Sequence, residues 1–294
     1  MAVKSNNLEK TLKIAIVLTF IFFVIEVVGG LISGSLSLLS DAGHMLRDAL
    51  ALFISFSAIS IAKKLPTPTK AFGYHRAEIL AALANGLLLA AISVWIFFEA
   101  YSRFFEPKPV ESATMFVIAL AGLLINLYVG YKLHGSHDLN IRSAFMHVVT
   151  DAVSSVAVIF ASIWIFFTNQ AIIDPIVSAV LAFLILVSAL MIISDSIHIL
   201  LGFAPKNISF EDVINSIKKS KGVKDVHDVH LWTLCSNINV IDAHILTDRT
   251  KITQLEAIKR QIKKNLEKYN IKHTTLEFEC EECSGSIKTK AIRH

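Results

Sequence analysis

Long apolar runs alternate with short polar breaks over the first two thirds of the chain. Glycine, proline and asparagine occur in the breaks, as is typical of segments where a chain turns. Each run is close to the length of about 20 residues that a helix needs to cross a bilayer. The pattern therefore predicts six transmembrane helices, at roughly 12–32, 36–62, 79–103, 112–133, 141–168 and 172–201.

From about Pro205 the pattern changes to shorter segments. Two of them, "ISFEDVINSIKKSKG" and "KITQLEAIKRQIKKNLEKY", have the spacing of amphipathic helices, and Ser209 is the expected N-cap of the first. Three others, "VKDVHDVHLWTL", "NINVIDAHILT" and "HTTLEFEC", alternate as strands do. We therefore predict two domains. They are a six-helix transmembrane domain over 1–204 and a C-terminal α+β domain over 205–294, with its helices on one face of a small sheet.

Composition and charge support a membrane protein. Hydrophobic residues make up 54% of the chain and the mean hydropathy is +0.59, which excludes an ordinary soluble globule. The net charge of +4 does not indicate nucleic-acid binding. Lys and Arg gather at the N-terminus and in the second and fourth breaks, so the positive-inside rule places both termini in the cytoplasm. The three cysteines give no disulfide framework, and the first run lacks the cleavage site of a signal peptide.

The same pair of costly polar residues occurs in two of the apolar runs. "HMLRD" contains His44 and Asp48, and "HVVTD" contains His147 and Asp151. Residues four apart lie on one face of a helix, so two such helices can offer two nitrogens and two oxygens to one point. That ligand set suits tetrahedral Zn²⁺, and ionisable residues inside a membrane mark functional sites. We predict a shared metal site made by these four residues.

Other polar residues lie close to this predicted site. Asp41 shares a face with His44, where it either orients the imidazole or serves helix packing. Arg47 either pairs with Asp41 or Glu26 or points into an aqueous cavity, or else it competes with metal for Asp48. Further buried polar residues are predicted to be interhelical contacts rather than ligands: Glu26, Glu99, Asn85, Asn126 and Asp174.

Several stretches carry a resemblance to a known family. They are "SLSLLSDAGHMLRDALAL", "FGYHRAEILAALANG", "NIRSAFMHVVTDAVSSV", "DPIVSAVLAFLIL", "SIHILLGFAP" and "VHDVHLWTL". With these the chain resembles bacterial zinc, cobalt and cadmium efflux proteins of the cation diffusion facilitator family. The resemblance implies six transmembrane helices, a ferredoxin-like cytoplasmic domain, a homodimer and metal–proton exchange. It also implies that the transport site lies on the second and fifth helices, at His44, Asp48, His147 and Asp151.

The C-terminal domain carries a second set of candidate metal ligands. Strand alternation places His227 on one face with Val229 and Leu231, and puts Glu277 and Glu279 together on the last strand. The related transporters use histidines and a terminal CxxC as regulatory zinc ligands. The predicted cytoplasmic site consists of His227, His244, Glu277, Cys280 and Cys283. The alternative is that the histidines are surface residues and the two thiols bind nothing.

These predictions describe a transporter rather than an enzyme. Protons and Zn²⁺ compete for imidazole and carboxylate, so we expect a proton-coupled antiporter of the bacterial inner membrane that exports Zn²⁺ by alternating access. Its expected partners are a second copy of the chain, the lipid bilayer, Zn²⁺ and H⁺, without nucleic acid. Zn²⁺ is the substrate and a regulatory ligand, and no catalytic cofactor is expected. Alternatives are export of Cd²⁺, Co²⁺ or Ni²⁺, an intramembrane metalloenzyme, which the lack of "HExxH" disfavours, and a membrane-tethered metal sensor.

Overall fold

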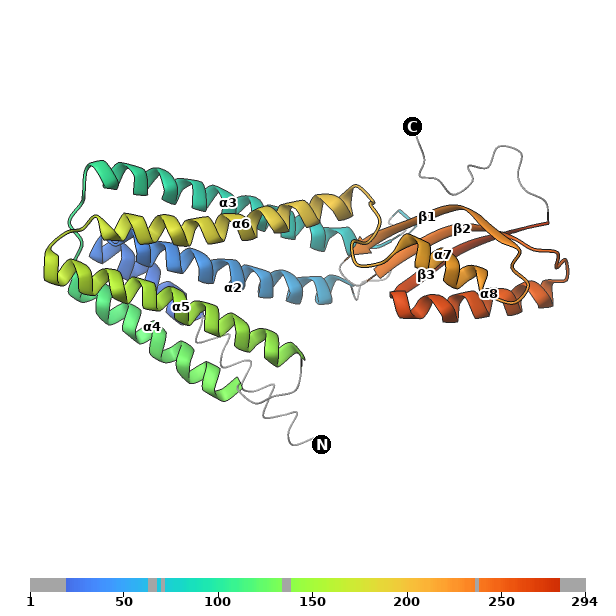
Figure 1. Ribbon diagram of the computed structural model, residues 1–294, viewed down its shortest axis with the longest axis horizontal. Helices are drawn as coiled ribbons and strands as arrows, with labels where there is room; N and C mark the ends of the chain where they lie inside the picture. Colours follow the sequence, from blue (N-terminus) through green and yellow to red (C-terminus); the bar gives the residue numbers. More distant parts are fainter. Residues whose placement is uncertain (1–19, 63–67, 70–71, 134–138, 236–237, 281–294) are drawn as a thin grey trace. The chain divides into compact units, whose positions relative to one another are not determined.

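The computed structural model describes residues 20–62, 68–69, 72–133, 139–235 and 238–280 (Figure 1). Within these ranges, the side chains of residues 48, 51–62, 132–133 and 139–147 are not described. The chain divides into two compact units. One contains Met1–Phe56 and Ala82–Ile193, and the other contains Ser57–Ala81 and Ser194–His294. The predicted domain boundary after residue 204 stays a prediction.

The predicted apolar runs form helices. The first is helical over its described part, Phe20–Ser33. The others are α2 (Leu36–Ala62), α3 (His75–Phe105), α4 (Ser112–Leu133), α5 (Leu139–Thr168) and α6 (Ile173–Leu200). Among the described residues, four stretches are long and apolar enough to cross a membrane, namely His75–Phe105, Ser112–Tyr131, Val148–Thr168 and Ile173–Leu200. The helical membrane fold predicted from the sequence is confirmed.

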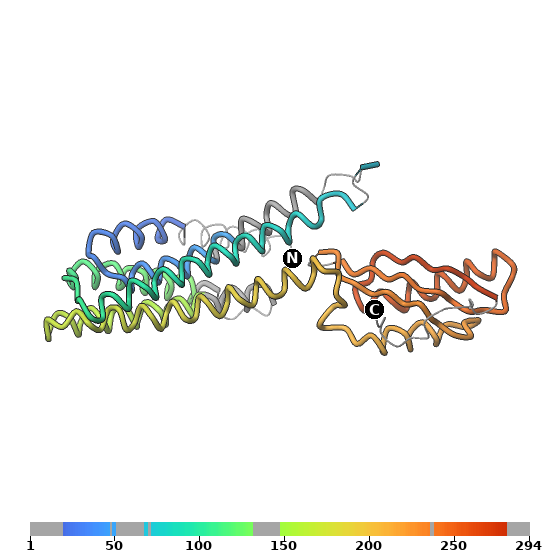
Figure 2. Tube along the Cα trace, turned by 90° about the horizontal axis from the view of Figure 1, so that it is seen from above, coloured from blue at the N-terminus to red at the C-terminus, as the bar shows by residue number. Residues whose placement is uncertain are grey.

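We call the unit that contains Met1–Phe56 and Ala82–Ile193 the helical unit, and the other the C-terminal unit. The helices of the helical unit run roughly lengthwise beside one another, as Figure 2 shows. Short turns connect them where the sequence favours an end. Gly34, with φ of 68°, takes a left-handed conformation between the first helix and α2 that a side chain would strain. Pro107 and Pro109 follow α3, where a missing amide and a fixed φ prevent the helix from continuing.

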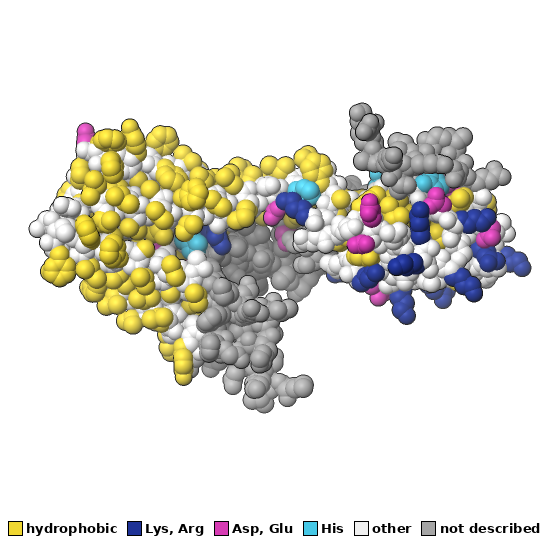
Figure 3. Space-filling model, in the orientation of Figure 1, with side chains coloured by type: hydrophobic (Ala, Val, Ile, Leu, Met, Phe, Trp, Pro, Cys, Tyr) yellow, Lys and Arg dark blue, Asp and Glu magenta, His cyan; other side chains and the backbone are white. Residues whose placement is uncertain are grey.

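Small and aliphatic side chains let the helices pack closely. One buried cluster joins α2, α4 and α5 through Leu38, Ala119 and Ala161. Large apolar side chains point outward instead, among them Phe98 and Phe167, which are 71% and 77% exposed. Hydrophobic side chains cover most of the visible surface of this unit (Figure 3). An apolar surface of this extent fits contact with lipid rather than water.

The C-terminal segments form an α+β fold, as predicted. Its elements are α7 (Phe210–Lys218), β1 (Asp225–Cys235), β2 (Ile238–Leu246), α8 (Ile252–Leu266), the short 3₁₀ helix η1 (Glu267–Tyr269) and β3 (Ile271–Glu279). The strands lie in the order β1-β2-β3, with β1 antiparallel and β3 parallel to β2. Ser209 caps α7 as expected, since its side chain accepts a hydrogen bond from the amide of Asp212.

Both helices cover the same face of this sheet (Figure 1). Ile217 of α7 and Ile262 of α8 are fully buried in one core with Ile241 and Ile245 of β2. Because side chains alternate along a strand, His244 of β2 lies on the opposite face. The open face of the sheet is therefore where a polar site can form.

A β-bulge interrupts the alternation of β1. The register shifts between His227 and His230, and Asp228 takes a left-handed conformation with φ of 46°. Val226 and Leu231 consequently both join the core although they are five residues apart. His227 lies on the face opposite Leu231, so the predicted grouping of His227 with Val229 and Leu231 is wrong. The extra residue of the bulge is the physical reason.

Candidate metal sites

Two of the four predicted membrane ligands meet in the helical unit. Nε2 of His44, on α2, lies 3.5 Å from Oδ1 of Asp151, on α5. Their side chains are 12% and 7% exposed, so the contact is largely shielded from solvent. It joins the first residue of one HxxxD pair to the last residue of the other.

The register of α2 and α5 bears on the other two predicted ligands. Asp41 contacts Ser154 while His44 contacts Asp151, so a step forward along α2 is a step backward along α5. The helices are therefore antiparallel, and position 48 on α2 comes opposite position 147 on α5, one turn from His44 and Asp151. The side chains of Asp48 and His147 lie outside the described residues, so their part in the site stays a prediction.

Hydrogen bonds brace α2 against α5 beside this contact. Asp41 accepts hydrogen bonds from the hydroxyls of Ser154 and Ser155, the second at 3.5 Å. Both hydroxyls also lie within 3.0 Å of the carbonyl oxygen of Asp151. These contacts of Asp41 favour the interpretation of helix packing.

Arg47 reaches a different helix from those that the sequence suggested. Its Nη1 donates a hydrogen bond to Oγ of Ser188, on α6, at 2.9 Å. This hydrogen bond links α2 to α6. The competition with metal for Asp48 stays a prediction, because that carboxylate is not described.

Asp174 fixes the start of the helix that carries His44. It belongs to α6 and is fully buried, and its carboxylate accepts hydrogen bonds from the amides of Leu36 and Ser37 at 2.7 and 3.1 Å. The hydroxyls of Ser35 and Ser37 donate to it as well, at 2.8 and 2.6 Å. A carboxylate at a helix N-terminus satisfies free amides and complements the helix dipole. Asp174 is thus an interhelical contact, as predicted.

A second cluster lies on the open face of the C-terminal sheet. His227 and His244 are opposite each other on β1 and β2, and Glu279 comes from β3. The two carboxylate oxygens of Glu279 lie 2.9 Å from Nε2 of His227 and 2.7 Å from Nδ1 of His244. One ligand atom from each residue lies within 4.8 Å of the others. Two imidazoles and a carboxylate are ligands that Zn²⁺ commonly takes in proteins, so these three residues fit a zinc site.

The remaining predicted residues of the cytoplasmic set lie around this trio. Oε2 of Glu277 is 3.6 Å from Nε2 of His244, but the Glu277 side chain is 66% exposed. Cys280 is exposed directly after β3, and Cys283 lies outside the described residues. Sequence reasoning left Glu279 out of the set, although alternation had placed it on the same face as Glu277.

Asp228 was also missed. From the bulge, its Oδ1 lies 3.3 Å from Nε2 of His230 and its Oδ2 lies 3.6 Å from Nε2 of His244. A non-glycine residue at positive φ is a strained position that the surrounding structure must support. No feature of strand alternation signals such a bulge, and the bulge also determines the face on which His227 lies.

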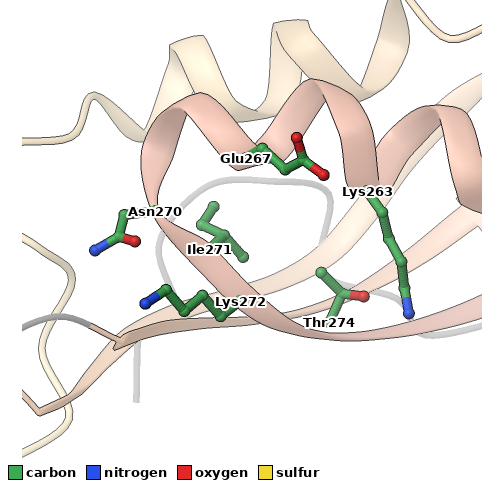
Figure 4. Close-up of a pocket in the computed structure, with 6 residues that line it drawn as sticks. All are labelled: Lys263, Glu267, Asn270, Ile271, Lys272 and Thr274. Atoms are coloured by element: carbon green, nitrogen blue, oxygen red, sulfur yellow. The ribbon is translucent and has the colours of Figure 1, made fainter.

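A separate cavity of about 320 Å³ lies near the end of α8 and the start of β3 (Figure 4). It is lined by Lys263, Glu267, Asn270, Ile271, Lys272 and Thr274. Among the described residues, this lining shares no member with the cluster of His227, His244 and Glu279.

Comparison with known proteins gives two matched domains and several relatives. Residues 12–201 match the cation efflux transmembrane domain, and residues 205–281 match the cytoplasmic domain of cation efflux proteins. A "Cadmium, cobalt and zinc/H(+)-K(+) antiporter" of Bacillus subtilis is 39% identical over 93% of this chain and 89% of its own. The "Metal cation efflux system protein CzcD" of Cupriavidus metallidurans is 38% identical over 94% and 88%. The "Zinc transporter ZitB" of Pectobacterium atrosepticum is 40% identical over 95% and 88%.

Proposed function

The chain belongs to the cation diffusion facilitator (cation efflux) family, and on this premise we propose that it exports Zn²⁺ from the cytoplasm in exchange for H⁺. The contact between His44 and Asp151 is the observation that carries the proposal, since it joins two HxxxD helices at buried ligand groups. The names of the relatives support zinc as the substrate, with Cd²⁺ and Co²⁺ as further substrates. Ni²⁺ is a further candidate substrate, because ligand type ranks these ions only weakly.

The exchange follows from the protonation chemistry of the ligands. Zn²⁺ binds neutral imidazole and ionised carboxylate, so metal and protons exclude each other at His44 and Asp151. Asp48 and His147 complete the proposed set. When the site faces the cytoplasm it captures Zn²⁺, and when it faces a more acidic exterior protons displace the metal. Transport by this cycle needs no chemical step on the substrate, which makes the protein a transporter and not an enzyme.

The proposed setting is the inner membrane of a bacterium. The chain crosses it several times with both termini in the cytoplasm, as the distribution of Lys and Arg indicates. The C-terminal domain pairs with that of a second copy in a homodimer, consistent with the matched cytoplasmic domain. Nucleic acid has no part in this function.

Zn²⁺ has a second proposed role, as a regulatory ligand of the C-terminal domain. His227, His244 and Glu279 would hold it, since their ligand atoms already converge. Glu277, Cys280 and Cys283 are proposed as additional ligands. A cation bound here joins all three strands and would stabilise the sheet when cytoplasmic zinc is plentiful.

Metal uptake into proteoliposomes with an imposed pH gradient tests the transport proposal. We expect gradient-dependent Zn²⁺ flux in the unmodified protein and none above background in His44→Ala and Asp151→Asn. The matched controls are His198→Ala and Asp195→Asn on α6, where the histidine bonds a backbone carbonyl and the exposed aspartate pairs with Lys206. Normal flux in both site variants would refute the site. Absence of flux in the folded, unmodified protein would refute the function.

A further inference from the structure

Glu26 is a buried carboxyl group that the proposed metal site does not use. It lies on the first helix, Phe20–Ser33, and is 1% exposed. Among the described residues, no group donates a hydrogen bond to either of its carboxylate oxygens. The carboxyl group of another acid, Asp41 of α2, is close enough to interact with it.

Within the described part of the chain, the surroundings of the two acids offer no compensating positive charge. Gly122 of α4 closes one side, where an added Cβ would lie 3.5 Å from Oε1 of Glu26. From α5, Ser154 and Ser155 contact Asp41, and the carboxylate of Asp151 is close enough to interact electrostatically with Glu26. No Lys or Arg in the described part of the chain forms an ion pair with Glu26 or Asp41. Two ionised carboxylates cannot remain in contact in such a site, so the pair must hold a proton.

The hydrogen bonds decide which acid carries the proton. Asp41 accepts hydrogen bonds from the hydroxyls of Ser154 and Ser155, and these bonds favour its ionised form. Among the residues that the structure describes, Glu26 has no such donor. A proton held by the pair would therefore reside on Glu26 and be donated to Asp41. Two acids with such different surroundings divide into a proton carrier and an anion.

This pair is coupled to the proposed transport site. Asp41 comes three residues before His44, and the two serines that contact Asp41 also contact the carbonyl oxygen of Asp151. A divalent cation at His44 and Asp151 brings two positive charges close to the pair and favours two carboxylates over one. Because Glu26 and Asp41 come from different helices, relative motion of these helices also changes the contact that holds the proton.

We propose that Glu26 and Asp41 form a second proton site that takes part in the exchange. Glu26 holds the proton while the transport site is empty and releases it to the solution that the site faces when Zn²⁺ binds. The charges of the metal then compensate both carboxylates, and the proton returns to Glu26 when the metal leaves. This inference rests on the proposed metal–proton exchange and adds to it one proton that does not come from a metal ligand.

The test counts the protons that the purified protein releases on binding Zn²⁺ in weakly buffered solution. Glu26→Gln keeps the shape of the side chain and offers Asp41 a permanent N–H donor, so we expect Zn²⁺ binding with about one proton fewer released. In the infrared difference spectrum, we expect the carbonyl band of a protonated carboxyl group to disappear on Zn²⁺ addition, and the variant to lack this change. Glu99→Gln is the matched control, because Glu99 is ion-paired with Arg103 and Lys108.

Equal proton release and equal infrared changes in the unmodified protein and in Glu26→Gln, with Zn²⁺ bound in both, would overturn the inference. Asp41→Asn provides a second variant if the first does not fold. The amide side chain introduced at position 41 can donate a hydrogen bond to Glu26, so Glu26 no longer needs a proton to make this contact. We therefore expect the same deficit of about one released proton. Failure of the unmodified protein to bind Zn²⁺ would instead refute the proposed function. The spectrum of the metal-free protein would then still show whether Glu26 is protonated.

Discussion

The two candidate metal sites use the same kinds of ligand on different scaffolds. In the helical unit, one histidine and one aspartate face each other from α2 and α5, 3.5 Å apart. In the C-terminal unit, two histidines and Glu279 are held by neighbouring strands, with contacts of 2.7 and 2.9 Å. Helices can shift along and around each other, whereas strands in one sheet are fixed by their shared backbone hydrogen bonds.

This difference suggests different tasks. A transport site must gain and lose its metal in every cycle, and ligands on separate helices can be brought together or drawn apart by helix motion. A site spread over three hydrogen-bonded strands keeps its ligands together whether or not metal is bound. We infer that the membrane site is suited to exchange and the sheet site to retention.

The largest effects should come from removing a ligand of each site and measuring Zn²⁺ flux. Loss of residues that only support a metal ligand costs 10–100-fold, so His44→Ala should reduce flux by at least about 100-fold. His244→Ala should leave flux within about 10-fold of normal, because its site retains rather than carries metal. Both measurements use proteoliposomes with equal amounts of reconstituted protein. Equal losses in the two variants would show that the sites do not have separate tasks.

A second prediction concerns the support of the membrane site. Asp174→Ala removes the acceptor of two backbone amides and two hydroxyls at the start of α2, so unfolding should become easier by about 3 kcal/mol. A smaller effect is expected for Ser209→Ala at the start of α7, which removes one capping hydrogen bond and should lower the free energy of unfolding by about 1 kcal/mol. Denaturation of the full chain in detergent measures both. A larger loss for Ser209→Ala would show that the cap from Asp174 is not what holds α2.

The third prediction isolates the sheet site. Zn²⁺ at 100-fold over its Kd should stabilise β1, β2 and β3 by about 2.7 kcal/mol, which slows their amide hydrogen exchange by up to about 100-fold. Glu279→Gln should abolish this protection, because Glu279 contacts both histidines. Glu277→Gln, which changes an exposed side chain, and His44→Ala, in the other unit, should retain most of it. Protection that survives Glu279→Gln would place the metal elsewhere.

Sequence reasoning was most successful where a physical periodicity extends over many residues. Six apolar runs and the α-β-β-α-β order were predicted because hydrophobic patterning persists through a whole helix or strand. The Ser209 cap was found because helix starts have a local signature. The contact between His44 and Asp151 follows from two HxxxD pairs, since each pair fixes one helix face.

The features that were missed depend on single residues or on pairing between distant segments. The bulge at Asp228 adds one residue and reverses the face of His227, which alternation cannot reveal. The register of β2 and β3 pairs His244 with Glu277, yet Glu279, two residues further along β3, is the residue that contacts both histidines. Ser188, to which Arg47 donates a hydrogen bond, is 141 residues away, and nothing in either local sequence indicates that contact.

The smallest predicted effect lies at the surface of the C-terminal unit and tests whether single charges matter there. Lys218 Nζ lies 2.6 Å from Oδ1 of Asp225, and this hydrogen bond lowers the pKa of Asp225 below its usual value of 3.8. The pair therefore stabilises the fold above pH 3.8, and this contribution is lost as the pH falls through the lower, folded-state pKa. Because both side chains are more than 40% exposed, it should be no more than about 0.5 kcal/mol. Lys218→Met should return the pKa of Asp225 toward 3.8 in an NMR titration, whereas Lys259→Met, at another exposed pair, should not change it. A pKa unchanged by Lys218→Met would show that the ammonium group does not set the charge of Asp225, and would leave the backbone amide of Val226 and the charge of His227 as the groups that lower this pKa.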